Sequence, residues 1–193
     1  NSKFINVYHL DLYRIQKPFQ FSLFGASGDL AKVKIFPALY ALAAQRRFPA
    51  DFSLVGFART AKSHKDFQKD FFDGITKKSD QAADETIARN LLNHVDYFTG
   101  QYDSKKSFQE FGKFLLKKSR GKKVTQLFYL AVPPKIFHSI IEQLASLRAV
   151  LGDDIRLIIE KPFGNDEKSA EELFHHVLMY FPSSKVFLLD HYL

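Results

Sequence analysis

The stretch FSLFGASGDLAKVKIFPALYALAA, residues 21–44, carries the strongest indication of the fold of this chain. It opens with an apolar run, turns at Gly25 and Gly28, and continues with apolar residues spaced as on one face of a helix. Gly25 suits the positive φ of a tight turn, and Gly28 leaves the backbone bare where the helix begins. Ala31 is small enough for the helix to lie close to the strand. The stretch therefore predicts a strand, a glycine loop and a helix in succession.

The glycine loop is a candidate anion site. N–H groups in the first turn of a helix lack partners within the helix and carry the positive end of its dipole, so they favour a phosphate. The pattern is G-x-x-G-x-x-A, which departs from the full dinucleotide pattern G-x-G-x-x-G, and a plain turn without ligand stays the alternative. A nucleophile elbow is excluded because Ser27 directly precedes Gly28, and a P-loop is excluded because no Gly-Lys-Ser/Thr follows. Asp29 is interpreted as a structural carboxylate in the first helical turn.

The rest of the chain alternates between strand and helix patterns. Predicted strands cover residues 20–24, 52–57, 95–99, 126–132, 155–160 and 185–189. Predicted helices cover residues 29–45, 63–76, 82–92, 104–118, 135–147 and 167–180. Most strands are continuous apolar runs, which indicates burial on both faces, as in a parallel sheet covered by helices. The sequence thus predicts an α/β fold with a doubly wound, mostly parallel sheet and helices on both faces, a Rossmann-like dinucleotide-binding domain.

Composition sets outer limits on the function. The 193 residues are 46% hydrophobic and contain no cysteine, which excludes a disulfide framework and a thiolate metal site. The histidines show no metal spacing, so we expect no metal, and apart from His191 they are interpreted as structural. The absence of cysteine favours a reducing compartment, and we expect a cytoplasmic location. The chain does not begin with Met and ends in a strand-like run, so we expect a fragment of a longer protein.

The net charge of +7 is concentrated in one stretch. Residues 101–125 hold eight lysines or arginines against two acidic residues. We interpret them as a solvated helix face and its exit loop. The alternative is a nucleic-acid site, which predicts binding that weakens steeply with salt.

The end of the second predicted strand indicates which dinucleotide the loop would take. NAD sites usually place Asp or Glu there to accept from the ribose hydroxyls, but this strand is followed by Arg59 and Thr60. A guanidinium can bind a 2′-phosphate through forked, charge-assisted hydrogen bonds. The sequence therefore favours NADP over NAD, with an exposed Arg59 of no special role as the alternative.

Three separated motifs converge on one family. GASGDLAKVKIFPALY (25–40), EKPFGND (160–166) and the terminal DHYL (190–193) together resemble the coenzyme domain of the glucose-6-phosphate dehydrogenases. VGFAR (55–59), GQYD (100–103) and FYLAVPP (128–134) occur in the order of their family counterparts. The resemblance runs from about residue 21 to residue 193 and leaves residues 1–19 unassigned.

The resemblance implies roles for individual residues. The coenzyme loop would consist of Gly25, Ala26, Ser27, Gly28, Asp29, Leu30, Ala31 and Lys32. Arg59 would hold the 2′-phosphate of NADP, Ala131 would lie beside the coenzyme, and Lys161 would touch both coenzyme and sugar. His191 and Tyr192 would help hold the sugar phosphate, although from the residues alone Asp190 and His191 could form an acid–base pair. Phe137 departs from the family, which often has Tyr at this place near the coenzyme.

The resemblance also implies an activity and its limits. The family oxidises D-glucose 6-phosphate to 6-phosphoglucono-1,5-lactone, the first step of the oxidative pentose phosphate pathway. Residues 20–193 would be the NADP-binding domain of such an enzyme, expected to be a homo-oligomer without nucleic-acid or membrane partners. The catalytic histidine and most of the α+β domain that forms the sugar site would lie beyond Leu193. We therefore expect this chain alone to bind NADP without turning over.

Two further interpretations stay open. The glucose-fructose oxidoreductase-like enzymes also combine a glycine loop with an EKP lysine, but they usually show G-x-G-x-x-G and nothing like DHYL. A non-catalytic NADP-binding or scaffold domain is the second, and the presence of Lys161 and His191 argues against it for the parent protein.

Overall fold

A six-stranded parallel sheet forms the centre of the chain. The computed structural model describes residues 14–78, 83–164 and 166–189. The strands run in the order β3-β2-β1-β4-β5-β6, and each neighbouring pair is parallel. They are β1 (Phe19–Phe24), β2 (Phe52–Ala58), β3 (Val95–Thr99), β4 (Thr125–Leu130), β5 (Ile155–Glu160) and β6 (Val186–Leu189). The order reverses between β1 and β4, which is where ligands bind in open sheets of this kind.

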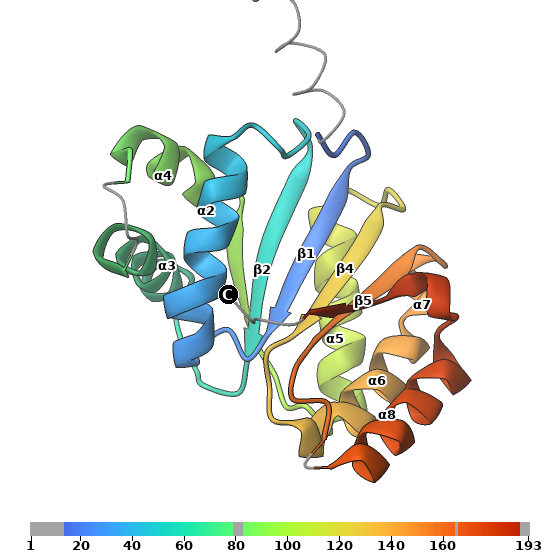
Figure 1. The fold of residues 1–193 in the computed structure, drawn as a ribbon. Coiled ribbons are helices and arrows are strands. Elements are labelled where there is room, and N and C mark those ends of the chain that lie inside the picture. Colours follow the sequence, from blue (N-terminus) through green and yellow to red (C-terminus); the bar gives the residue numbers. More distant parts are fainter. Residues whose placement is uncertain (1–13, 79–82, 165, 190–193) are drawn as a thin grey trace, which may run out of the picture.

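Helices cover the sheet in two groups (Figure 1). One face packs on α2 (Phe36–Ala44), α3 (His64–Lys78) and α4 (Glu85–Leu92). The other face packs on α5 (Lys105–Lys118), α6 (Phe137–Ser146), α7 (Arg148–Leu151) and α8 (Glu167–Tyr180). Short turns of other helix types are η1 (Ala31–Ile35), η2 (Pro134–Ile136) and η3 (Ser183–Lys185). The predicted doubly wound α/β architecture is confirmed.

Aromatic side chains fill the centre of both cores. Phe24 and Phe57 lie on neighbouring strands with their ring centroids 4.7 Å apart, and both are fully buried. On the opposite face Phe36 of α2 meets Phe71 of α3 at 4.6 Å. Burial of each such ring contributes about 1.5–3 kcal/mol. Much of the phenylalanine excess of the sequence therefore packs between the helices and the sheet.

The strand register brings the functional loops to one edge. Phe24 pairs with Phe57 on one side and with Leu130 on the other, and Leu130 pairs with Ile159. The loops that follow these residues therefore leave the sheet at one edge, here called the carboxyl edge. In Figure 1 it lies at the lower ends of β1 and β2.

The structure corrects the first predicted helix. Residues 29–45 are helical through Ala44, but Ala31–Ile35 form a π-helical turn rather than part of a uniform α-helix. The N–H of Phe36 donates to the carbonyl of Ala31, five residues back. Pro37 has no N–H to continue the ordinary pattern, which accounts for the change of hydrogen-bond spacing.

Other predicted boundaries shift by a few residues. The helix predicted for 82–92 begins at Glu85, because the Asp84 side chain caps it by accepting from the N–H groups of Thr86 and Ile87. The helix predicted for 135–147 starts with the 3-10 turn η2, and the strand predicted for 126–132 ends at Leu130. In the described ranges no helix has both the length and the apolar character needed to cross a membrane.

Candidate functional site

The glycine loop is held tightly against its neighbouring strands. The N–H groups of Gly25 and Ala26 both donate to the carbonyl of Phe57, at 3.0 and 3.3 Å. Gly25 has a φ of +87°, and a Cβ at this position would lie 2.1 Å from the carbonyl oxygen of Ala131. No other residue fits without moving β4 or the loop. The structure thus brings together Gly25 and Ala131, two of the predicted coenzyme contacts.

The second glycine closes the loop and starts the helix. The N–H of Gly28 donates to the carbonyl of Gly25 at 2.9 Å, and the carbonyl of Gly28 accepts from Lys32 at 3.4 Å. The Gly28 amide is therefore used inside the turn, which leaves the amides of Asp29 and Leu30, in the first helical turn, as the candidates for an anion contact. Ala31 is completely buried, as its predicted packing role requires.

The end of β2 meets the glycine loop through side chains. The Ser27 hydroxyl lies 3.3 Å from the Thr60 hydroxyl, and the Tyr97 hydroxyl donates to the Thr60 carbonyl at 2.6 Å. Arg59 is exposed, with its guanidinium carbon 5.5 Å from the centroid of the Tyr102 ring. A cationic group, two hydroxyls and the helix start therefore converge at this corner of the carboxyl edge.

The Lys32 side chain reaches toward helix α3. Its Nζ lies 3.4 Å from Oδ2 of Asp70, which also accepts a hydrogen bond from Lys62. Burial works to raise the pKa of Asp70, but the adjacent ammonium groups of Lys62 and Lys32 outweigh it and hold the pKa below its ordinary value. Lys32, the last residue of the predicted coenzyme loop, is thus engaged with a carboxylate.

Lys161 sits at the same edge, two strands away from β1. It follows Glu160 at the end of β5, and its N–H donates to the carbonyl of Leu189 on β6 at 3.2 Å. The side chain is exposed, with Nζ 6.0 Å from the Phe163 ring centroid, and the Lys161–Pro162 bond is cis. Neighbouring strands are about 4.8 Å apart, and only β4 lies between β1 and β5, so Lys161 follows β5 at the same edge of the sheet as the glycine loop.

The remaining predicted residues fall elsewhere. His191 and Tyr192 lie outside the described residues. Phe137, where a coenzyme-facing tyrosine is typical of the resembled family, is 1% exposed and belongs to the core beneath α6. In the described ranges no three His, Cys, Asp or Glu residues are grouped to hold a metal ion.

Two tyrosines at the site were missed by sequence reasoning. Tyr97 supports Thr60 from β3, and burial raises its pKa to about 12, so it stays a hydrogen-bond donor. Tyr102 lies under Arg59, with its hydroxyl beside the Gly25 backbone, and burial raises its pKa too. Tyr97 lies in the middle of β3 and Tyr102 in the loop that follows it, and the position of Tyr102 after a strand end was the available signal.

The basic helix has an ordinary amphipathic arrangement. Phe108, Phe111 and Leu115 of α5 are fully buried, whereas most of its lysines are exposed. Lys118 at its end pairs with Asp96 of the edge strand β3, at 2.6 Å. This arrangement agrees with the interpretation of a solvated helix face.

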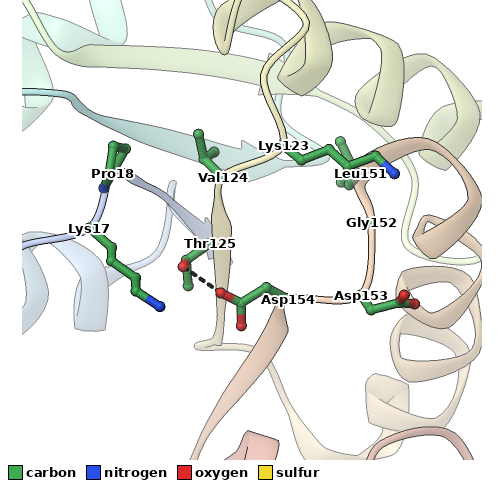
Figure 2. A pocket seen from close by; sticks show the side chains of 9 residues that line it. All are labelled: Lys17, Pro18, Lys123, Val124, Thr125, Leu151, Gly152, Asp153 and Asp154. Carbon is green, nitrogen blue, oxygen red and sulfur yellow. Dashed lines mark hydrogen bonds between the residues drawn. The ribbon is translucent and has the colours of Figure 1, made fainter.

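A cavity of about 410 Å³ lies at the opposite, amino edge of the sheet (Figure 2). Lys17, Lys123 and Asp153 line it together with Asp154. The Asp154 carboxylate accepts from Thr125 at 2.6 Å, from Lys185 at 2.7 Å and from Arg156 at 3.2 Å. These contacts join the amino ends of β4, β5 and β6. The Asp154 carboxylate therefore stabilises the sheet and lies at the edge opposite the glycine loop.

Comparisons with known proteins agree with this geometry. A family model described as glucose-6-phosphate dehydrogenase, NAD binding domain, matches residues 22–193. The chain is 41% identical over 173 residues to the chloroplastic glucose-6-phosphate 1-dehydrogenase 1 of Arabidopsis thaliana, covering 88% of this chain and 30% of that protein. It is 36% identical over 172 residues to a chloroplastic glucose-6-phosphate 1-dehydrogenase of Spinacia oleracea, again covering 88% and 30%. The chain therefore spans less than a third of the length of these relatives.

A solved structure shares the fold. It is described as glucose-6-phosphate dehydrogenase in complex with its substrate glucose-6-phosphate, and it superposes with a TM-score of 0.80 at 34% identity. The match covers 93% of this chain and 37% of that one. The resemblance inferred from the motifs and the prediction of a dinucleotide-binding domain are confirmed.

The predicted cytoplasmic location is wrong as an inference from this sequence. Both plant relatives are named chloroplastic, so membership of this group does not imply a cytoplasmic location. Absence of cysteine cannot distinguish among reducing compartments.

Proposed function

The chain belongs to the glucose-6-phosphate dehydrogenase family, and we propose that it binds NADP at the glycine loop as the coenzyme-binding part of such an enzyme. Residues 20–193 form the NADP-binding domain in this proposal, and residues 1–19 have no assigned role. The chain spans only part of its relatives, and we propose that the whole protein has the dehydrogenase activity of the family.

The observation that carries the choice of NADP is the corner formed by Arg59, Thr60 and Ser27. The hydroxyls of Ser27 and Thr60 lie 3.3 Å apart. Arg59, whose guanidinium is exposed, is the first residue after β2. An NAD site needs an acceptor for the ribose hydroxyls here, whereas this corner presents a cation and hydroxyl donors. A 2′-phosphate meets such a set with charge-assisted hydrogen bonds.

The chain's residues also fit the rest of a dinucleotide. A Cβ at Gly25 would fill the space over Ala131, so the loop's shape depends on a bare backbone at that point. The amides at Asp29 and Leu30 face the position of the pyrophosphate in this proposal, and Lys32 adds positive charge behind them. Ala131 and Lys161 flank the nicotinamide end. The bound coenzyme supplies the acceptor for a hydride from the substrate.

The proposed substrate is D-glucose 6-phosphate, oxidised at C1 to 6-phosphoglucono-1,5-lactone in the first step of the oxidative pentose phosphate pathway. Lys161 would hold a sugar oxygen through its ammonium group, and His191 and Tyr192 would hold the phosphate. Positioning the hydroxyl against the coenzyme supplies much of the rate by proximity. Removal of the hydroxyl proton requires a base from outside this chain, in a parent enzyme proposed to be a homo-oligomer.

The first test is the thermal stability of the chain with NADP⁺, with NAD⁺ and without ligand. A ligand at about 100 times its Kd stabilises the folded state by roughly 2.7 kcal/mol, which gives a clear rise in Tm. We expect a rise with NADP⁺ and a much smaller one with NAD⁺ at the same concentration. Equal rises would keep the dinucleotide site but contradict the choice of NADP, and no rise with either would contradict both.

The second test separates binding from turnover. The chain is mixed with NADP⁺ and glucose 6-phosphate, and NADPH is followed by its absorbance. We expect binding in the first test without NADPH formation in this one. Steady NADPH production by the purified chain would show that a base within residues 1–193 suffices. It would contradict the proposal that the base lies outside this chain.

A further inference from the structure

Two lysines from different functional loops share one carboxylate on α3. Lys62 hydrogen-bonds to Oδ2 of Asp70, and Nζ of Lys32 lies 3.4 Å from the same oxygen. Lys32 belongs to the turn that follows the glycine loop, whereas Lys62 follows Arg59 by three residues. The three side chains are 21–29% exposed, so their interaction is screened less than that of a pair on the open surface.

The helix that carries Asp70 is docked closely on the glycine-loop side. Gly74 lies one turn after Asp70 and therefore on the same face of α3. A Cβ at Gly74 would come within 2.9 Å of the Lys32 carbonyl and 3.0 Å of the Phe36 ring. The missing side chain lets α3 approach the backbone of η1, which gives Asp70 a fixed place from which to reach Lys62.

The segment Arg59–Lys62, here called the ribose loop, is fixed at two separate points. At Thr60 it is held by the hydroxyls of Ser27 and Tyr97. Tyr97 in turn stacks on Phe67 of α3 at 4.5 Å. At Lys62 the loop is held by Asp70. Helix α3 thus contacts both supports of a loop whose first residue, Arg59, is the proposed phosphate ligand.

We propose that Asp70 is a positioning residue for coenzyme selectivity, which anchors Lys62 and so holds the ribose loop in the conformation that receives a 2′-phosphate. This inference rests on the proposed function, because it assigns the indirect support of the same NADP corner. Asp70 touches no coenzyme in this arrangement. The trio of Lys32, Asp70 and Lys62 keeps a net positive charge, so the carboxylate does not cancel the attraction for a phosphate.

Two other roles for Asp70 and Lys62 predict different binding results from a positioning role. A purely structural ion pair would contribute stability and affect NADP⁺ and NAD⁺ alike. A direct phosphate ligand at Lys62 would be restrained by Asp70, and removal of the carboxylate would strengthen NADP⁺ binding. A positioning role predicts a loss that is confined to the coenzyme with the 2′-phosphate.

The experiment measures the Kd of the chain for NADP⁺ and NAD⁺ by calorimetry at one salt concentration, for Asp70→Asn, Lys62→Met and the double variant. Asp73→Asn is the matched control, since it removes a carboxylate that pairs with Lys77 on the same helix at 3.2 Å. We expect Asp70→Asn to weaken NADP⁺ binding about 3- to 30-fold and NAD⁺ binding less than about 2-fold. The double variant should be no weaker than Lys62→Met, because Asp70 acts through Lys62. The control should match the unmodified chain.

Equal losses for both coenzymes, an unchanged NADP⁺ Kd, or tighter NADP⁺ binding in Asp70→Asn would each overturn the inference. Amide hydrogen exchange in the ligand-free chain gives an independent readout. We expect faster exchange at residues 60–62 in Asp70→Asn and Lys62→Met but not in Asp73→Asn, and unchanged rates would overturn the anchoring itself. Failure of the unmodified chain to bind NADP⁺ would instead overturn the proposed function, so the two failures are distinguishable.

Discussion

The Tyr129 hydroxyl donates a hydrogen bond to Oε2 of Glu160 at 3.0 Å, joining β4 to β5 directly before Lys161. Glu160 is only 8% exposed, and a buried carboxylate is costly unless it is hydrogen-bonded. Burial, and then the Glu160 charge, raise the pKa of Tyr129, so the hydroxyl keeps its proton and its role as donor. The pair thereby stabilises the end of β5 from which Lys161 projects.

Tyr129→Phe should lower the free energy of unfolding by about 1–3 kcal/mol, because it removes a donor from a buried carboxylate. Urea denaturation followed by circular dichroism measures the change. Tyr180→Phe is the control, since among the described residues the Tyr180 hydroxyl has no hydrogen-bond partner. If both variants lose the same small amount, the Tyr129 hydroxyl is not a significant support of Glu160.

Gly25→Ala should cost more stability than a positive φ alone explains. The added methyl meets the Ala131 carbonyl at 2.1 Å, and we expect a loss of about 2–5 kcal/mol from strain and overpacking together. Gly121→Ala is a close control, because Gly121 has a φ of +75° but nothing within 4 Å of the new methyl. The difference between their urea midpoints reports the close approach of the loop to β4, and equal midpoints would argue against it.

Arg59→Ala should weaken NADP⁺ binding about 10- to 150-fold, the worth of one charge-assisted hydrogen bond of roughly 1.5–3 kcal/mol. NAD⁺ binding should change little, since NAD⁺ lacks the 2′-phosphate. Arg59→Lys retains the charge but loses the forked geometry, so its affinity for NADP⁺ should fall between those of the unmodified chain and Arg59→Ala. Calorimetric Kd values test this order, and a parallel loss of NAD⁺ binding would place Arg59 elsewhere on the coenzyme.

Asp154 should make the fold sensitive to acid. Its hydrogen bonds, with Lys185 first and Thr125 next, hold its pKa well below the ordinary aspartate value of about 4. A carboxyl whose pKa is lower in the folded chain stabilises the fold above the unfolded pKa, and this contribution declines as the pH falls below about 4. Urea titrations at neutral pH and at about pH 3 should show a smaller acid-induced loss for Asp154→Asn than for the unmodified chain. An identical loss would mean that other carboxyls dominate acid unfolding.

Sequence patterns predicted the sheet and its functional edge because both follow from local chemistry. Apolar runs too continuous for one-sided burial required a parallel sheet between helices, and the direction of the chain then placed every strand-to-helix loop at the same edge. Gly25 and Arg59 were found because each directly follows a strand and carries chemistry that a solvated loop does not need.

Local sequence patterns were enough to predict the order of strands and helices, the glycine turn and the basic residue after β2. The side chains that support these features became apparent only from the way the elements pack together. Tyr97 and Asp70 reach the ribose loop from β3 and α3, and the contact of Asp70 depends on the close approach of α3 to η1, which Gly74 allows. Periodicity marks the face on which a residue lies, whereas a partner distant in sequence is set by the packing of whole elements, and that packing exists only in the folded chain.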